Sequence, residues 1–242
     1  MTFGLIGKNL KHSFSQSYFT RKFEKAGLHT YQYLNFELNS IEELPGLLDR
    51  YPDLKGFNVT IPYKKAILPY LHHLSDEAKA IGAVNTVKRV GTELYGYNTD
   101  WWGFVQSLEP LLETQHQRSM ILGSGGASAA VAYGLSQLGM NSLVVSRNAG
   151  SGDVNYAQAA QILEEHFVVI NSTPVGTWPQ VDEMPPLDLG HLGEKHLVYD
   201  LIYNPPESKL LRLAKEKGAS TINGIKMLEL QAEKAWAIWN EL

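Results

Sequence analysis

Residues 119–128 read SMILGSGGAS, and this stretch decides the fold. Its first half is a short apolar run, which is typical of a buried strand. Its second half is a glycine-rich turn, and the small residues from Ala127 to about Leu138 predict a helix directly after it. A strand, a glycine turn and a helix in this order are the arrangement of a dinucleotide-binding fold.

The glycine turn also has the chemistry that a bound phosphate needs. Gly123, Gly125 and Gly126 are expected to allow positive φ and to let the backbone approach a bound group closely. Amide groups at the start of the following helix would then point at an anion such as a pyrophosphate. Ser128 replaces the third glycine of the usual pattern, so a tight turn without a ligand stays the alternative.

The next strand, predicted from Ser142 to Ser146, indicates which dinucleotide binds. Arg147 follows it, at about the position where NAD-binding folds carry an acidic residue for the ribose 2′-hydroxyl. A guanidinium can instead bind a 2′-phosphate through two hydrogen bonds, and the Ser146 hydroxyl could donate another. The pattern therefore favours NADP over NAD, with a solvated surface arginine as the alternative.

Strand-type and helix-type segments alternate along the whole chain, which predicts an α/β fold with largely parallel strands. An antiparallel hairpin is expected where two strands meet across Gly91 and Thr92. Residues 148–155 and the proline-rich residues 173–189 are predicted loops, and an amphipathic helix is predicted from Gly224 to Leu242. The other strands are predicted at Phe3–Ile6, Tyr31–Leu38, Gly56–Ile61, Ala83–Val90, Glu93–Tyr97, Phe167–Asn171 and Leu197–Ile202.

Composition limits the classes of function. The chain has 242 residues, a formal net charge of −4 and no cysteine. Scattered lysines and arginines argue against a nucleic-acid surface, and the lack of cysteine excludes disulfides, thiol catalysis and cysteine-bound metals. No stretch has the pattern of a signal peptide or a membrane span, so we expect a cytoplasmic protein.

Polar residues lie after the first predicted strand and within the third. Ser13 and Ser15 come after the first strand, where their hydroxyls could both donate to a carboxylate. Ser15 is also a predicted N-cap of the next helix, and this structural role is the alternative. Asn58 and Thr60 are expected on one face of their strand, because side chains two residues apart point the same way.

Three further polar residues are candidates with equally simple structural alternatives. Lys64 follows Pro62, which ends a strand, and Asn85 lies in the AVNT stretch of the predicted strand Ala83–Val90. Asp100 precedes a helix predicted to start at Trp101, so an N-cap role competes with a catalytic one.

The combination of motifs, in this order, resembles the shikimate dehydrogenase family. The resemblance covers essentially the whole chain, from about residue 5 to the last helix. It rests on HSFS at 12–15, NVTIPYK at 58–64, GAVNT at 82–86, NTD at 98–100, GSGGAS at 123–128 and GIKMLELQA at 224–232.

The resemblance implies two domains with an active-site cleft between them. Residues 1–100 and 224–242 would form an α/β substrate domain with a mixed sheet, and residues 101–223 an NADP-binding Rossmann domain. The implied reaction is the reversible reduction of 3-dehydroshikimate to shikimate, on the pathway to chorismate and the aromatic amino acids. The implied ligands are this small-molecule substrate and NADP, without a metal, a nucleic acid or a membrane, in a monomer or homodimer.

The resemblance also assigns roles to residues of this chain. Ser13 and Ser15 would hold the substrate carboxylate, with Tyr203 on the same side. Lys64 and Asp100 would be the catalytic pair. The ring hydroxyls would be bound by Asn58, Thr60, Asn85 and Gln231, and the cofactor by Gly123, Ser124, Gly125, Gly126, Ala127, Ser146, Arg147, Thr173 and Gly224.

The chain departs from the family pattern at several positions. Gln16 replaces a proline, Trp101 replaces a glycine, and Ser146-Arg147-Asn148 replaces Asn-Arg-Thr. The further basic residue that the family pattern has near Arg147 is missing. Two alternative functions stay open: a quinate or dual quinate/shikimate dehydrogenase, and a dinucleotide-binding protein without catalysis.

Overall fold

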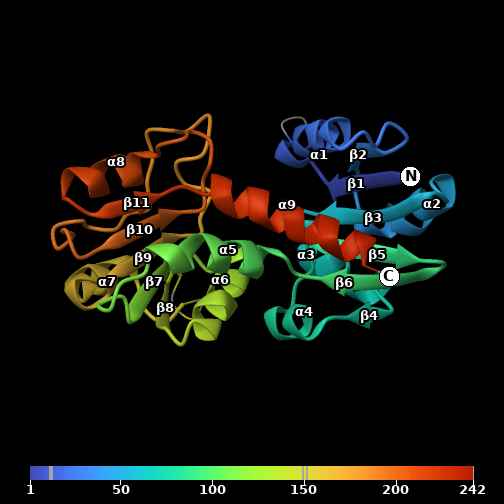
Figure 1. Cartoon of the computed structure of the whole chain (residues 1–242). Helices are drawn as coiled ribbons and strands as arrows, with labels where there is room; N and C mark the ends of the chain where they lie inside the picture. Colours follow the sequence, from blue (N-terminus) through green and yellow to red (C-terminus); the bar gives the residue numbers. More distant parts are fainter. Residues whose placement is uncertain (11–12, 149, 151, 242) are drawn as a thin grey trace. The chain divides into compact units, whose positions relative to one another are not determined.

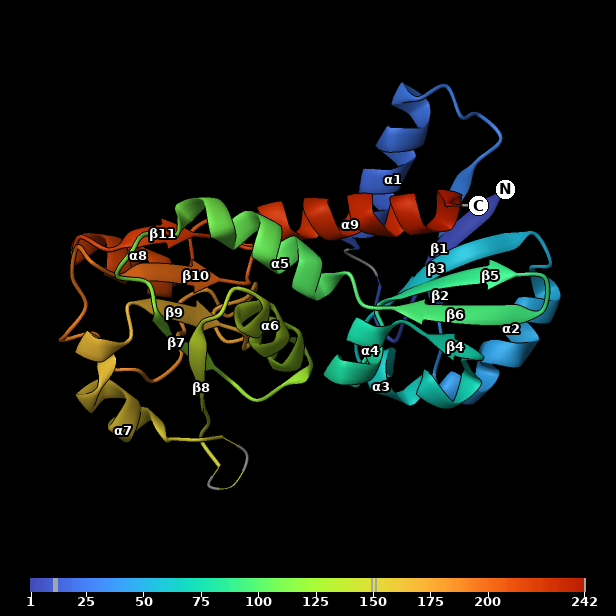
Figure 2. The ribbon, with the colours of Figure 1, turned by 60° about the horizontal axis from the view of Figure 1, so that its bottom comes forward.

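The computed structural model describes residues 1–10, 13–148, 150 and 152–241. The chain divides into two compact units, of which the first comprises Met1–Thr99 and Ala232–Leu242 and the second Asp100–Gln231. Helix α9 (Ile225–Asn240) contributes to both units, because the division falls within it. Figures 1 and 2 label the helices and strands of both units.

The first unit is built on a six-stranded sheet with the order β2-β1-β3-β5-β6-β4. Strand β1 runs parallel to β2 and β3, whereas β5 runs antiparallel to β3 and to β6. This arrangement confirms the predicted mixed sheet and the hairpin across Gly91 and Thr92. The strands are β1 (Thr2–Gly7), β2 (Gln32–Glu37), β3 (Leu54–Val59), β4 (His73–Leu74), β5 (Thr86–Val90) and β6 (Glu93–Tyr97).

Helices cover both faces of this sheet. Phe3 and Leu5 of β1 point to one face, where they pack with Phe19 of α1 and Trp239 of α9. Ile6 lies on the opposite face, in a core shared with the other three helices. The helices are α1 (Phe14–Lys25), α2 (Leu44–Arg50), α3 (Tyr63–Ala66) and α4 (Asp76–Ile81).

Helix α1 begins two residues earlier than the sequence pattern suggested. Ser13 is its N-cap, and the Ser13 Oγ accepts a hydrogen bond from the Gln16 amide at 3.4 Å. Ser15 lies inside the first turn, so the prediction of Ser15 as the N-cap is wrong. Both serines can cap a helix by residue type, and the course of the chain after β1 selects Ser13. His12, which opens the HSFS motif, lies outside the described residues.

The second unit has a five-stranded sheet, ordered β11-β10-β9-β7-β8, in which every pair is parallel. Strand β7 lies between β8 and β9. The next strand in the chain, β8, is added on one side of β7, and β9 to β11 are added on the other side. This change of direction is the position where doubly wound sheets bind nucleotides, at the carboxyl ends of the strands. The strands are β7 (Arg118–Leu122), β8 (Asn141–Val145), β9 (Val168–Asn171), β10 (Leu197–Asp200) and β11 (Ser220–Ile222).

Two apolar cores enclose the second sheet. One joins Ile121 of β7 to Phe104 of α5, Val131 of α6 and Met227 of α9, and both views show α5 and α6 against each other (Figures 1 and 2). The other joins Met120 to α7, α8 and the loop after β9. The helices are α5 (Asp100–Leu108), α6 (Gly126–Gln137), α7 (Tyr156–Gln161) and α8 (Lys209–Glu216).

The start of α5 differs from the prediction by one residue. The helix begins at Asp100 itself, so the carboxylate belongs to the first turn and is not the N-cap of a helix from Trp101. An acidic residue in the first turn still interacts favourably with the helix dipole. Among the described residues, no helix combines the length and the apolar character that crossing a membrane requires.

Candidate active site

The candidate substrate residues of the first unit gather at one edge of its sheet. Ser13 follows β1, Thr60 follows β3, and Asn85 directly precedes β5. Because β1 and β3 are parallel and β5 is antiparallel to β3, the ends of β1 and β3 and the start of β5 share an edge. The Thr60 amide donates to Ile6 O at 2.9 Å and the Val59 amide to Asn85 O at 2.8 Å, which ties the three strands together there.

Asn58 is the centre of a buried hydrogen-bond network at this edge. The Tyr33 hydroxyl of β2 donates to Asn58 Oδ1 at 2.8 Å. The Asn58 Nδ2 group donates to Asn85 O at 3.2 Å and to Thr86 Oγ1 at 3.0 Å. Since both amide protons are used, Asn58 could contact a substrate only by accepting a hydrogen bond through Oδ1.

Tyr33 was missed by the sequence analysis, and it links two of the candidates. Burial raises the pKa of the Tyr33 hydroxyl, while a hydrogen bond with Ser15 opposes that rise. The same hydroxyl donates to Asn58, so Tyr33 connects α1 with β3. The only sequence signal was an aromatic residue in an alternating strand, which predicts a core side chain and no polar contact.

Asn85 is likewise buried and hydrogen-bonded. Its Oδ1 accepts from the Thr99 amide at 2.7 Å, and its Nδ2 donates to Thr99 Oγ1 at 3.0 Å. Asp100, which is 8 % exposed, directly follows Thr99 in the chain. Lys64 lies on the short helix α3, and its carbonyl accepts from the Val84 amide at 2.8 Å. The backbones that carry Lys64 and Asn85 are therefore joined.

The second unit contains a cavity of about 670 Å³ at the carboxyl ends of β7, β8 and β9. The glycine turn, the residues after β8 and the start of the proline-rich loop form its walls. The lining residues that the sequence analysis named are Gly123, Ser124, Gly125, Ser146, Arg147 and Thr173.

The three glycines of the turn have different roles. Gly123 has a φ of +102°, and a Cβ there would lie 2.6 Å from Thr173 Cγ2. Gly125 has a φ of −80°, Gly126 has no positive φ either, and a Cβ on either residue would meet no atom within 4 Å. The expectation of positive φ is therefore correct for Gly123 and wrong for Gly125 and Gly126. The space beside these two is open at the start of α6.

Ser146 and Arg147 leave β8 beside this turn. Ser146 Oγ lies 3.5 Å from Ser124 Oγ and accepts from the Asn148 amide at 3.3 Å. Arg147 is exposed and shares the cavity with Tyr156 of α7. Burial raises the pKa of Tyr156, and the nearby Arg147 charge partly offsets this rise. A positive charge thus lies at the predicted position.

The buried carboxylate of Asp200 is linked by hydrogen bonds to Thr173, which lines the cavity. Thr173 Oγ1 donates to Asn171 Oδ1 at 2.7 Å, and Asn171 Nδ2 donates to Asp200 Oδ1 at 3.0 Å. Burial raises the pKa of Asp200 to about 6, although hydrogen bonds from Ser208, the Ile202 amide and Asn171 act in the opposite direction. The sequence analysis missed both Asn171 and Asp200, whose signal was a polar residue at the end of an apolar strand.

The comparisons with known proteins agree with this geometry. A sequence model described as the shikimate dehydrogenase substrate binding domain matches residues 5–87. A protein named shikimate dehydrogenase (NADP(+)) from Clostridium botulinum is 37 % identical over 249 residues, covering 98 % of this chain and 96 % of its own length. The chain belongs to the shikimate dehydrogenase family.

Other shikimate dehydrogenases extend the match. The Aquifex aeolicus protein, also named for NADP(+), is 39 % identical over 250 residues, covering 98 % of this chain and 90 % of its own length. The crystal structure of the Thermus thermophilus enzyme with NADP(H) and shikimate superimposes with a TM-score of 0.88 at 32 % identity, covering 100 % of this chain and 94 % of that one. The predicted family and α/β fold are thereby confirmed.

The remaining candidate residues lie in the second unit. Tyr203, 37 % exposed, follows β10, and Gln231 is a buried residue of α9. Gly224 donates its amide to Ile202 O at 3.0 Å, and a Cβ there would lie 2.0 Å from Leu201 O, so only glycine fits. Ala127 is half-buried in the first turn of α6. Lys64 and Asp100 belong to different units.

Proposed function

We propose that this chain is an NADP-dependent shikimate dehydrogenase, which reversibly reduces 3-dehydroshikimate to shikimate in aromatic amino acid biosynthesis. The observation that carries the proposal is the 37 % identity to a shikimate dehydrogenase (NADP(+)) across 98 % of the chain. We place the enzyme in the cytoplasm, as a monomer or homodimer. Size-exclusion chromatography with light scattering measures that assembly.

The substrate would bind to the polar edge of the first sheet. Ser13 and Ser15 hold its carboxylate, and Tyr203 contributes on the same side. Asn58, Thr60, Asn85 and Gln231 bind the ring hydroxyls. The hydrogen bonds among Tyr33, Asn58 and Thr86 support this assignment, because they hold the Asn58 oxygen in one orientation before a ligand arrives. We assign residues 1–100 and 224–242 to this substrate domain and 101–223 to the NADP domain.

The cavity of the second unit fits a dinucleotide. Open space beside Gly125 and Gly126, at the start of the twelve-residue helix α6, leaves room for a pyrophosphate at the amide groups. Arg147 and Ser146 would bind the 2′-phosphate, while Thr173 and Gly224 would contribute to the cofactor site. When bound, NADPH supplies the hydride that the carbonyl group of the substrate accepts.

Lys64 and Asp100 would carry the proton chemistry. As hydride reaches the C3 carbonyl carbon, negative charge develops on its oxygen, and the Lys64 ammonium can donate a proton to it. Asp100 would orient the ammonium and a substrate hydroxyl through its carboxylate. In the reverse direction the amine of Lys64 accepts the proton that the substrate hydroxyl releases.

Reduced-nicotinamide absorbance tests the proposal directly. Purified protein is mixed in parallel with shikimate or quinate and with NADP or NAD. We expect rapid formation of NADPH with shikimate, slower reaction with quinate and slower use of NAD. Faster oxidation of quinate would instead indicate a quinate dehydrogenase, and no reaction in any arm would indicate a non-catalytic protein.

A further inference from the structure

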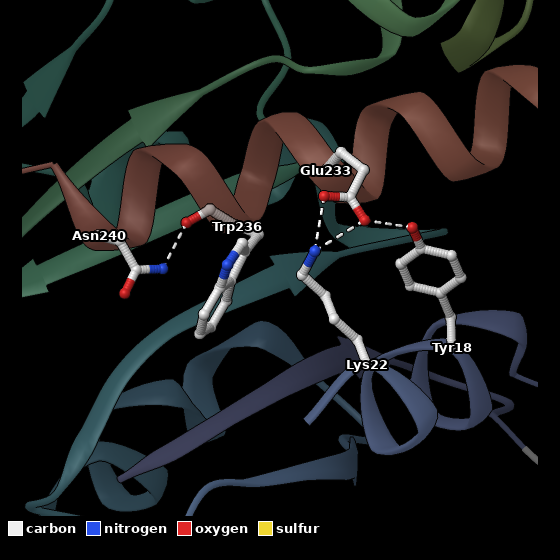
Figure 3. Close-up of polar contacts among 5 residues, drawn as sticks. All are labelled: Tyr18, Lys22, Glu233, Trp236 and Asn240. Atoms are coloured by element: carbon white, nitrogen blue, oxygen red, sulfur yellow. Dashed lines mark hydrogen bonds and ion pairs between the residues drawn. The ribbon is translucent and has the colours of Figure 1, made fainter. Parts of the chain in front are cut away.

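A polar contact links helix α1 to helix α9 in the first unit (Figure 3). The Lys22 ammonium donates to both oxygens of Glu233, at 2.8 and 2.6 Å, and the Tyr18 hydroxyl donates to the same carboxylate. Tyr18 and Lys22 are four residues apart on α1, so they lie on one face of that helix. One carboxylate of α9 thus holds two successive turns of α1.

The groups around this contact are aromatic. The Lys22 ammonium lies 5.8 Å from the centre of the Trp236 ring, which packs on Phe3 and Phe23 at ring distances of 5.5 and 5.4 Å. Apolar contacts of this kind favour burial but have no preferred direction, so they tolerate a small slide of one helix along the other. Charge-assisted hydrogen bonds are directional and define the register.

The carboxylate of Glu233 is held in its charged form. Partial burial raises its pKa, but the hydrogen bonds from Lys22 and Tyr18 and the Lys22 charge outweigh burial and lower the pKa overall. The side chains of Lys22 and Glu233 are 24 % and 43 % exposed. Exposed ion pairs generally add little stability. We therefore interpret this contact as one that aligns the two helices and adds little to the free energy of unfolding.

Helix α1 carries the two serines at the substrate edge. Ser13 is its N-cap and Ser15 lies in its first turn, three residues before Tyr18. At about 1.5 Å per residue, Tyr18 is only some 4.5 Å along the helix axis from Ser15. Phe19 stacks on Tyr33 at 4.6 Å, and Tyr33 contacts Ser15. A displacement of α1 at Tyr18 would therefore move both serine hydroxyls.

We infer that Glu233 is a positioning residue for the substrate carboxylate, acting through α1 on Ser13 and Ser15. The inference rests on the proposed function, in which these serines bind that carboxylate. The contacts of Glu233 are with Tyr18 and Lys22 of α1, and we assign it no role in binding the substrate or the cofactor directly. It keeps α1 in the register at which both hydroxyls can donate to the same carboxylate.

The first test is the Glu233→Gln variant. Glutamine keeps the shape and can still accept from Tyr18, but it loses the charge that attracts Lys22. We expect the KM for shikimate to rise about tenfold while kcat and the KM for NADP change less than twofold, because substrate binding alone is weakened. Glu229→Gln on the same helix is the matched control, since Glu229 pairs with Lys226 of α9. The control should leave all three constants unchanged.

A second readout separates positioning from a general effect on the fold. The methyl ester of shikimate has no carboxylate charge for the serines to bind. Wild type and Glu233→Gln should therefore differ about tenfold in kcat/KM with shikimate and less than twofold with the ester. Equal losses with both substrates, or no loss with shikimate, would overturn the inference.

Two further variants keep the test decisive. If Glu233→Gln does not fold, Lys22→Met removes the same ion pair from the other side and should give the same selective rise in KM. The charge exchange of Lys22→Glu with Glu233→Lys should restore much of the lost affinity, whereas no restoration counts against the role. Wild-type protein that does not oxidise shikimate would contradict the proposed function itself, which is a distinct result.

Discussion

The proposed substrate edge of the first unit, where Asn58, Thr60 and Asn85 lie, and the proposed cofactor cavity of the second unit are built in opposite ways. At the substrate edge, buried amides and hydroxyls already bond to one another, as Asn58 does with Tyr33 and Thr86. In the cofactor cavity, Gly125 faces open space and Arg147 is exposed. The first site is preorganised by side chains, whereas the second depends on backbone shape and a few charges. Changes in the first should therefore affect folding or turnover, and changes in the second should affect nucleotide affinity.

The largest effect is expected at the substrate edge, from Lys64→Ala. Removing the proposed proton donor should lower kcat about 10³-fold, within the range of general acid catalysis, while the KM for shikimate changes only a few-fold. Steady-state rates with saturating NADP measure both constants. Near-normal turnover would show that Lys64 does not serve as the acid.

The hydrogen-bonded network behind the cofactor cavity gives the second prediction. Burial raises the pKa of Asp200 from 3.8 to about 6, so the folded chain binds this proton more tightly than the unfolded chain does. Between about pH 4 and pH 6, Asp200 should therefore make unfolding easier as the pH rises, by up to ~3 kcal/mol. Urea unfolding of the wild type and of Asp200→Asn at several pH values measures this pH dependence of the unfolding free energy. The stability of the wild type relative to the variant should fall across this window, and parallel pH profiles would contradict the assigned pKa.

The third prediction compares the two regions by stability. Asn58→Ala would remove one hydrogen bond each from the Tyr33 hydroxyl, Asn85 O and the Thr86 hydroxyl, at a cost of about 2 kcal/mol. Gly125→Ala is the matched change in the cavity, where a methyl group meets no protein atom within 4 Å. Its unfolding free energy should change by less than ~0.5 kcal/mol. A similar loss in both variants would remove the contrast between the regions.

The smallest effect is expected from Arg147→Ala. Loss of the guanidinium should raise the KM for NADPH about tenfold and leave that for NADH nearly unchanged, because only NADPH carries the 2′-phosphate. Parallel titrations with both nucleotides measure this selectivity. Equal losses would show that Arg147 does not read the phosphate.

Much of the architecture follows from local sequence patterns. Alternating apolar runs located most strands to within two or three residues, and the GSGGAS turn located the start of α6 to within one residue. The short strand His73–Leu74 and the strand Ser220–Ile222 were missed, because two or three residues have too little pattern to detect. The assignment of roles at the site came from six motifs in order, and the roles themselves stay predictions.

The amino-acid sequence by itself determined the α/β class, the dinucleotide turn and the family, because these depend on periodicity and on motifs a few residues long. Only the tertiary structure decided that Ser13 caps α1, that Tyr33 bonds to Asn58, and that Asp200 is buried. It also brought Lys22 to Glu233, 211 residues away along the chain. Such contacts depend on strand register and helix packing, which join segments far apart in sequence and leave no local pattern.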